Sequence, residues 1–182
     1  MTIITDEQVA YINKGGVIAY PTSTLPGLGC LPTKEGLDTL FELKSRSADK
    51  PVSIGVASLD QVAHMVEIDP RIVEFVDAFP RGGLSVIYPA QQLLDARIGG
   101  QSVAIRVFDH PSARALALAV GPVTATSANE AGEEPANTVA EAASELGLPD
   151  IAVVAGNRET GPGSTFVKID FDSDEPLVTI IR

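Results

Sequence analysis

A cluster of basic residues follows a predicted helix. Lys44, Arg46 and Lys50 lie close together in a chain with 13 Lys and Arg against 24 Asp and Glu. Such a cluster could clamp a polyphosphate, because Arg46 offers a planar fork of N–H donors and Lys44 a point charge. The alternative is structural, since cations at a helix C-terminus interact favourably with the backbone dipole. The residues themselves leave both interpretations open.

An arginine lies in the middle of a predicted strand that is otherwise apolar. Arg106 belongs to the segment Ser102–Val107. Burying a guanidinium without an anionic partner costs several kcal/mol, so Arg106 needs such a partner. Asp109 or Glu67 could be a structural partner, and the carboxylate of a substrate is the other possibility.

Three further segments place hydroxyl or amide groups beside predicted strands. Pro21–Thr24 follows the first strand, Ser127 and Asn129 follow a later one, and the loop that starts at Thr160 leads into a strand through Ser164 and Thr165. Ligands of open α/β sheets collect at the carboxyl ends of strands. Each segment taken alone is also compatible with an ordinary turn or loop.

Strands and helices must alternate to position these groups. Apolar runs of strand length are separated by helical patterns of about ten residues, which is typical of α/β domains. The predicted strands are Val17–Tyr20, Val52–Ala57, Leu84–Tyr88, Val103–Val107, Val123–Thr126, Ile151–Val154, Thr165–Ile169 and Leu177–Ile181. We therefore predict one α/β domain over residues 1–182, with a twisted mixed β-sheet flanked by helices.

Capping signals predict where the helices begin. Thr5 with Gln8, Ser58 with Gln61 and Thr138 with Glu141 fit capping boxes. Asp69-Pro70 combines a cap with a first-turn proline, and Thr33 is expected to cap a helix that carries Leu37, Leu40 and Leu43.

Composition excludes several classes of function. Cys30 is the single cysteine, which excludes an internal disulfide and a cysteine-based zinc site, and two histidines are too few for a metal cage. A lone cysteine is usually a small buried hydrophobe rather than a nucleophile. The net charge of −11 argues against broad nucleic-acid binding. Without a secretory signal or a long apolar span, we expect a cytoplasmic protein with no membrane contact.

The segments in this order resemble the YrdC/TsaC family of threonylcarbamoyl-AMP synthases, from Ile4 to Ile181. The matching motifs are the loop Pro21–Thr24 with Gly27-Leu28-Gly29, the Lys44-x-Arg46 pair followed by Lys50-Pro51, the strand arginine Arg106, the Ser127-x-Asn129 pair and the Ser164-Thr165-Phe166-Val167 strand. Each motif is weak, but their combination is specific.

The resemblance implies a reaction and a role for each residue. Threonine is carboxylated by bicarbonate, and the carbamate oxygen then attacks the α-phosphorus of ATP and expels pyrophosphate. Lys44 and Arg46 would hold the triphosphate together with Lys50 and an ATP-borne magnesium ion. Arg106 would take the threonine carboxylate. Thr24 and Ser127 would bind the other polar groups of threonine, and Ser102, Asn129 and Ser164 would complete the ATP side.

The resemblance also implies partners and leaves alternatives. The product would pass to the machinery that transfers threonylcarbamoyl to tRNA, and a weak RNA contact is conceivable. This chain departs from the family at Leu25-Pro26, which stand where an aromatic residue is usual, and at Lys168, which replaces a frequent aspartate. A non-catalytic member that binds nucleotide or RNA is therefore one alternative. An unrelated nucleotide hydrolase is another, although the chain lacks a P-loop.

Overall fold

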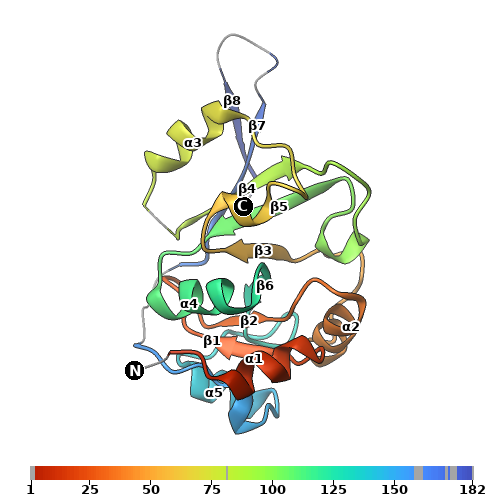
Figure 1. The fold of residues 1–182 in the computed structure, drawn as a ribbon, viewed down its shortest axis with the longest axis vertical. Helices are drawn as coiled ribbons and strands as arrows, with labels where there is room; N and C mark the ends of the chain where they lie inside the picture. Colours follow the sequence, from red (N-terminus) through yellow and green to blue (C-terminus); the bar gives the residue numbers. More distant parts are fainter. Residues whose placement is uncertain (1–2, 81, 158–161, 171, 173–175, 182) are drawn as a thin grey trace.

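The computed structural model describes residues 3–80, 82–157, 162–170, 172 and 176–181. Thr160 and Gly161, at the start of the loop before the last predicted strands, lie outside the described residues. The described part of the chain folds around one eight-stranded sheet, with helices packed on both of its faces (Figure 1).

The sheet is mixed, as predicted. Its strands in chain order are β1 (Ile18–Tyr20), β2 (Gly27–Gly29), β3 (Ser53–Val56), β4 (Leu84–Pro89), β5 (Ser102–Val107), β6 (Val123–Ser127), β7 (Thr165–Asp170) and β8 (Leu177–Ile180). Their order across the sheet is β1-β2-β6-β3-β5-β4-β7-β8. The pairs β3–β5 and β4–β7 are parallel, and the other neighbours are antiparallel. The predicted fold class is confirmed.

Five α-helices are described, and their N-termini follow mostly from local sequence. They are α1 (Asp6–Asn13), α2 (Lys34–Leu43), α3 (Pro70–Asp77), α4 (Pro111–Val120) and α5 (Val139–Glu145). Thr5 and Thr138 form the predicted capping boxes, and Thr33 and Asp69 accept the predicted cap bonds. These side chains satisfy N–H groups that the first helical turn leaves without partners.

The capping box predicted at Ser58 is wrong. Ser58 makes no side-chain cap bond, and the segment is a short 3-10 helix, Leu59–Val62. The Gln61 side chain instead accepts from the Ala57 N–H at 2.7 Å and donates to the Ala117 carbonyl at 2.8 Å. Long-range packing against α4 thus replaces the local cap.

The strand predicted at Ile151–Val154 is also wrong. This run contains a 3-10 helix, Asp150–Ala152, and makes one isolated bridge between Val153 and Ala19. The Val153 carbonyl accepts a bond from the Gln8 side chain at 2.9 Å. Because a side chain occupies that carbonyl, the apolar run is buried beside β1 without extending the sheet.

One strand and one α-helix were absent from the predictions. The glycine-rich segment Gly27–Gly29 forms β2 because β1 and β6 flank it on both sides. A Cβ at Gly27 would lie 2.8 Å from the Tyr20 ring, so only glycine permits this close approach. Helix α4 is capped by His110, an unusual N-cap residue, whose Nδ1 accepts from the Ser112 N–H at 3.1 Å.

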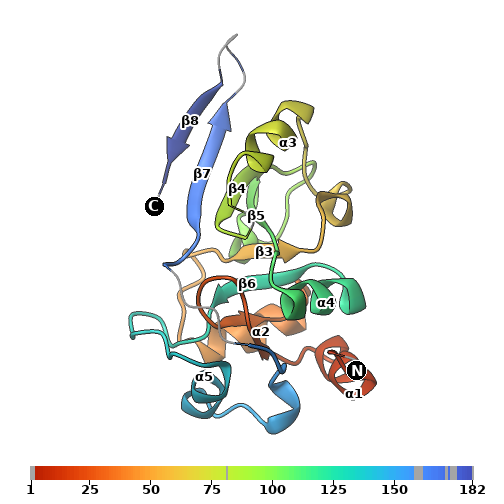
Figure 2. The ribbon, with the colours of Figure 1, turned by 90° about the vertical axis from the view of Figure 1, so that its left-hand side faces the viewer.

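The β1–β2–β6 end of the sheet is covered on both faces. Helices α1 and α4 lie on one side and α2 and α5 on the other, and α3 covers β4 at the opposite end of the molecule (Figure 2). Two apolar clusters result, one on each face, so that β1 is buried throughout. In the described part of the chain, no helix has the length and apolar character that a membrane span requires.

The first prediction concerns Cys30, which is buried beside α2. Burial raises the pKa of its thiol to about 12. Because the thiolate is the reactive form, we expect iodoacetamide at pH 8 to label the native protein at least about 100-fold more slowly than the urea-unfolded chain. Mass spectrometry of timed samples measures both rates. Comparable rates would show that Cys30 is an accessible thiol.

Candidate functional site

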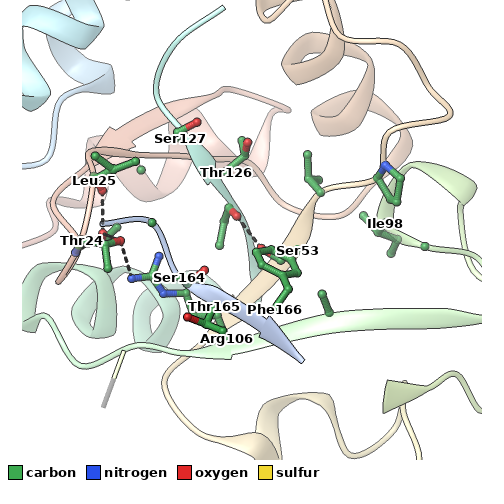
Figure 3. A pocket seen from close by; sticks show the side chains of 18 of the residues that line it. Thr24, Leu25, Ser53, Ile98, Arg106, Thr126, Ser127, Ser164, Thr165 and Phe166 are labelled. Carbon is green, nitrogen blue, oxygen red and sulfur yellow. Dashed lines mark hydrogen bonds between the residues drawn. The ribbon is translucent and has the colours of Figure 1, made fainter. Parts of the chain in front are cut away.

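A cavity of about 710 Å³ lies on one face of the sheet (Figure 3). Small-molecule sites typically occupy 300–1,000 Å³. The polar side chains that line it are Tyr20, Thr22, Thr24, Arg46, Ser53, Ser102, Arg106, Thr126, Ser127, Ser164 and Thr165. Most of the candidate segments from the sequence therefore meet at one place.

Strand register explains why these side chains share a face. Arg106 on β5 pairs with Ser85 on β4 and with Gly55 on β3. Ser85 pairs in turn with Phe166 on β7. Because paired residues point to the same side of a sheet, Arg106, Ser85 and Phe166 lie on the cavity face, whereas Ile105 points into the core on the other.

Arg106 is a buried cation held by neutral oxygens. Its exposed fraction is 7%. Its Nε donates to the Gly82 carbonyl at 2.7 Å, and its Nη2 donates to Thr24 Oγ1 at 2.8 Å and, at 3.5 Å, to Ser23 Oγ. Burial lowers the pKa of the guanidinium, yet arginine keeps its proton in proteins.

The structural partners considered for Arg106 are not used. None of the ion pairs between described residues involves Arg106, so neither Asp109 nor Glu67 neutralises it. Arg106 nevertheless lines the cavity. A buried guanidinium whose described contacts are all neutral favours an anion as the ligand of this cavity.

The loop after β1 is held by its own hydroxyls. Thr22 Oγ1 donates to the Leu25 carbonyl at 2.7 Å and accepts from the Thr24 N–H at 3.1 Å. The two threonine hydroxyls lie 3.2 Å apart. This network orients Thr24 Oγ1 towards the Nη2 group of Arg106. The hydroxyls of this loop therefore hold each other in place as one wall of the cavity.

Lys44 lies outside the cavity lining. It is 1% exposed, and its Nζ donates to the Ser127 and Asn129 carbonyls, each at 2.5 Å. Its own carbonyl accepts from the Ala131 N–H at 2.9 Å. Burial, with the nearby charge of Arg46, lowers the pKa of Lys44 to about 8. Lys44 therefore ties the loop after β6 to the end of α2.

Of the other two basic candidates, Arg46 lines the cavity and Lys50 does not. Arg46 Nε donates to the Lys50 carbonyl at 2.6 Å, and its Nη2 donates to the Pro51 carbonyl at 3.0 Å. These bonds fold the segment between α2 and β3 around the guanidinium. Lys50 thus contacts Arg46 through its backbone, and its side chain is exposed.

The Ser127 and Asn129 pair is split by the structure. Ser127 lines the cavity at the end of β6. Asn129 does not line it, and its Nδ2 donates to the Glu130 and Glu133 carbonyls at 2.9 and 2.6 Å. Its Oδ1 is buried without a partner among the described residues. Asn129 therefore shapes the loop that carries Ser127.

Ser102 and Ser164 both reach the cavity. Ser102 begins β5, and Ser164 precedes β7 with its Oγ 3.0 Å from that of Ser85. Ser164 lies beside Ser85, which pairs with Arg106, whereas Ser102 pairs with Pro89 at the other end of the β4–β5 ladder, so the two hydroxyls reach different parts of the cavity.

Several lining residues escaped the sequence analysis. Tyr20 and Phe166 supply aromatic rings to the cavity, although the loop itself carries Leu25 and Pro26 where an aromatic residue is usual. The Tyr20 hydroxyl donates to the Thr124 carbonyl at 2.9 Å, and Ser53 Oγ donates to the Ala125 carbonyl at 2.6 Å. Each is a strand residue, so its alternation within the strand was the only available signal.

The charge of the cavity wall has one sign. Among the described lining residues the charged side chains are Arg46 and Arg106, and none is Asp or Glu. Throughout the described part of the chain, no group of three or more His, Cys, Asp or Glu residues could hold a metal ion. The wall suits an anionic ligand.

Comparisons with known proteins identify the family of this chain. Residues 10–182 match the Sua5/YciO/YrdC family, which is described as "Telomere recombination". The chain belongs to this family. The resemblance found in the sequence is therefore confirmed.

Two bacterial proteins are similar to this chain over more than two thirds of its length. A threonylcarbamoyl-AMP synthase from Marinobacter nauticus is 38% identical over 131 residues, which is 69% of each protein. Another from Aliivibrio fischeri is 34% identical over 163 residues, covering 86% of this chain and 87% of the relative.

A solved family structure is also similar. The crystal structure of P. abyssi Sua5 complexed with L-threonine superposes with a TM-score of 0.79 at 27% identity. The match covers 93% of this chain and 51% of that protein, so this chain spans about half the length of Sua5.

The second prediction concerns the hydrogen bonds of the buried Lys44 side chain. Replacing Lys44 by Ala leaves the Ser127 and Asn129 carbonyls without their donor, so we expect the free energy of unfolding to fall by about 1–3 kcal/mol. Exposed Lys34, whose side chain pairs with Asp38 at 2.7 Å, provides the matched control, and its Ala variant should change stability much less. Urea denaturation of both variants measures this difference. Equal stabilities would contradict the assigned role of Lys44.

Proposed function

We propose that this chain makes threonylcarbamoyl-AMP and pyrophosphate from L-threonine, bicarbonate and ATP, for the threonylcarbamoyl-adenosine modification of tRNA. The observation that carries the proposal is Arg106, a buried cation without a carboxylate partner among the described residues, in the wall of the main cavity. The relatives named threonylcarbamoyl-AMP synthase and the Sua5 structure that contains L-threonine support it.

In this proposal Arg106 binds the threonine carboxylate. A guanidinium already fixed by Gly82 and Thr24 loses little conformational entropy when it forms charge-assisted bonds. Thr24, on the loop after β1, and Ser127, at the end of β6, would bind the remaining polar groups of threonine.

ATP would occupy the end of the cavity near Arg46. Arg46 would contact the phosphates directly, and the Ser102 and Ser164 hydroxyls would complete the nucleotide side. Lys44, Lys50 and Asn129, which were expected to bind ATP as well, would act in this proposal through the backbone segments that they hold. Binding of the ATP phosphates would therefore depend more on Arg46 than on Lys44.

The chemistry needs position and charge rather than a protein nucleophile. The threonine amine and bicarbonate condense to a carbamate with loss of water, and the carbamate oxygen displaces pyrophosphate from the α-phosphorus of ATP. Arg46 and Arg106 would neutralise the anions and hold them in line. Transfer of AMP to an oxygen makes the chain a nucleotidyltransferase.

A magnesium ion fits this cavity only as part of MgATP. The described lining residues supply hydroxyl and guanidinium donors but no carboxylate, and magnesium binds readily through phosphate oxygens. The ion would add charge neutralisation at the phosphates when bound. The residues of the chain would orient the phosphates and exclude water.

The product would be consumed by the tRNA threonylcarbamoyl-transferase machinery in the cytoplasm. With a net charge of −11, the chain is unsuited to extensive phosphate contacts with RNA. Any direct RNA contact would be weak, so the small-molecule product rather than a complex with tRNA would connect the two steps.

The third prediction tests the reaction. Pyrophosphate release from MgATP should require threonine and bicarbonate together, because the attacking oxygen exists only after carboxylation. Assays that omit each substrate in turn, in carbon-dioxide-free buffer, measure this dependence. Equal release without threonine would indicate an ATP hydrolase, and tight ATP binding without turnover would indicate a non-catalytic binding module.

The fourth prediction tests Arg106. An ammonium keeps the charge but cannot reproduce the planar fork, so Arg106→Lys should weaken threonine use by on the order of 10- to 150-fold, or about 1.5–3 kcal/mol. ATP affinity should change little. Separate threonine and ATP titrations, beside a melting curve, measure the three effects.

The control for this prediction is Arg71→Lys in α3, where the guanidinium pairs with Asp69 at 2.6 Å away from the cavity lining. It should leave both titrations unchanged. A parallel loss for both substrates in Arg106→Lys, together with a lower melting temperature, would instead assign Arg106 a purely structural role.

A further inference from the structure

The loop before β4 closes directly onto Arg106. The Gly82 carbonyl accepts the Arg106 Nε–H at 2.7 Å, which is the shortest of the described bonds to this side chain. Gly82 is itself buried. The orientation of the guanidinium therefore depends on where the Gly82 carbonyl lies.

Two observations favour glycine at residue 82. Its φ of +75° lies in the left-handed region, which residues with a side chain rarely adopt. A Cβ there would lie 2.2 Å from Ser23 Oγ and 3.1 Å from the Asp109 Cβ. With a side chain at residue 82, Ser23 or the backbone of this loop would have to shift, and with it the carbonyl that holds Arg106.

The neighbouring bonds hold the turn in place. The Gly83 N–H donates to the Pro80 carbonyl at 3.2 Å, and the Gly83 carbonyl accepts from the Thr165 N–H at 2.9 Å. Gly83 is thus anchored to the start of β7, and its neighbour Gly82 contacts Arg106. A displacement of Gly82 would therefore move the oxygen to which the Arg106 Nε–H is bonded.

We propose that Gly82 is a positioning residue for threonine binding, which sets the orientation of Arg106 through its carbonyl and its close contact with Ser23. This inference rests on the proposed function, because it assumes that Arg106 binds the carboxylate. Gly82 itself touches no substrate. It makes a loop outside the recognised motifs part of the specificity for threonine.

Gly82→Ala tests the proposal, with Gly83→Ala as the matched control. A Cβ at Gly83 would meet only the Pro80 carbonyl oxygen, at 3.4 Å, and its φ is not positive. We expect Gly82→Ala to raise the threonine KM by about 10-fold or more, as for the loss of a charge-assisted bond, and to leave the ATP KM within about twofold. Gly83→Ala should change neither KM by more than about twofold.

A rescue variant separates positioning from general damage. Ser23→Gly combined with Gly82→Ala removes the contact at 2.2 Å, so this double variant should recover part of the threonine affinity and should remain folded if Gly82→Ala does not. In an Arg106→Lys background, Gly82→Ala should add less than about a twofold loss, because the two changes act on one contact.

A spectroscopic measurement keeps the inference distinct from the proposed function. The Nε–H of Arg106, buried and bonded to Gly82, should give a slowly exchanging proton signal, identified by its absence in Arg106→Lys. Gly82→Ala should speed its exchange, and Gly83→Ala should not. If Arg106→Lys leaves threonine use unchanged, the proposed role of Arg106 fails. If Arg106→Lys impairs it but Gly82→Ala matches Gly83→Ala in exchange and in threonine KM, or weakens both substrates equally, the positioning role of Gly82 is overturned.

Discussion

Two cations are buried in this protein without carboxylate partners among the described residues, and the shape of the site depends on how neutral oxygens compensate them. Arg106 is held by a carbonyl and two hydroxyls, and Lys44 by two carbonyls. Removing a charge from water costs several kcal/mol, so each of these oxygens must be placed accurately. The loops that carry these oxygens are therefore held against the two cations.

The two buried cations therefore have different roles. Lys44 is enclosed completely by the segments that it connects, so its charge maintains the loop after β6. Arg106 reaches a cavity, so part of its field remains available to a ligand. In a chain with a net charge of −11, such a local positive wall concentrates anions where the overall charge repels them.

Local signals in the sequence were sufficient for much of the fold. Thr5, Thr33, Asp69 and Thr138 cap helices through contacts within three residues, and such contacts can be recognised in a linear pattern. The need of Arg106 for compensating partners was also visible, because an arginine among apolar strand residues is costly to bury alone, but its neutral partners Gly82 and Thr24 could not be identified from the sequence. The role of each proposed site residue stays a prediction.

Long-range contacts decided the features that the sequence analysis missed. β2 is a strand because its glycines fit beneath Tyr20 between two other strands, and no local pattern indicates this. Gln61 could cap its own helix, but it bonds to α4 instead. The hydrogen bonds of the Lys44 side chain similarly depend on the carbonyls of Ser127 and Asn129, which are more than 80 residues away in the sequence.

The order of the strands in the sheet also determines how late in folding the cavity can form. β2 pairs with β6, and β4 with β7, so each of these contacts must close a long loop, and such closures slow folding. Ser164 and Phe166, which complete the cavity wall, leave the ribosome after Arg106. During synthesis Arg106 therefore emerges before its cavity is complete, and the cavity face beside it stays open until β7 joins the sheet.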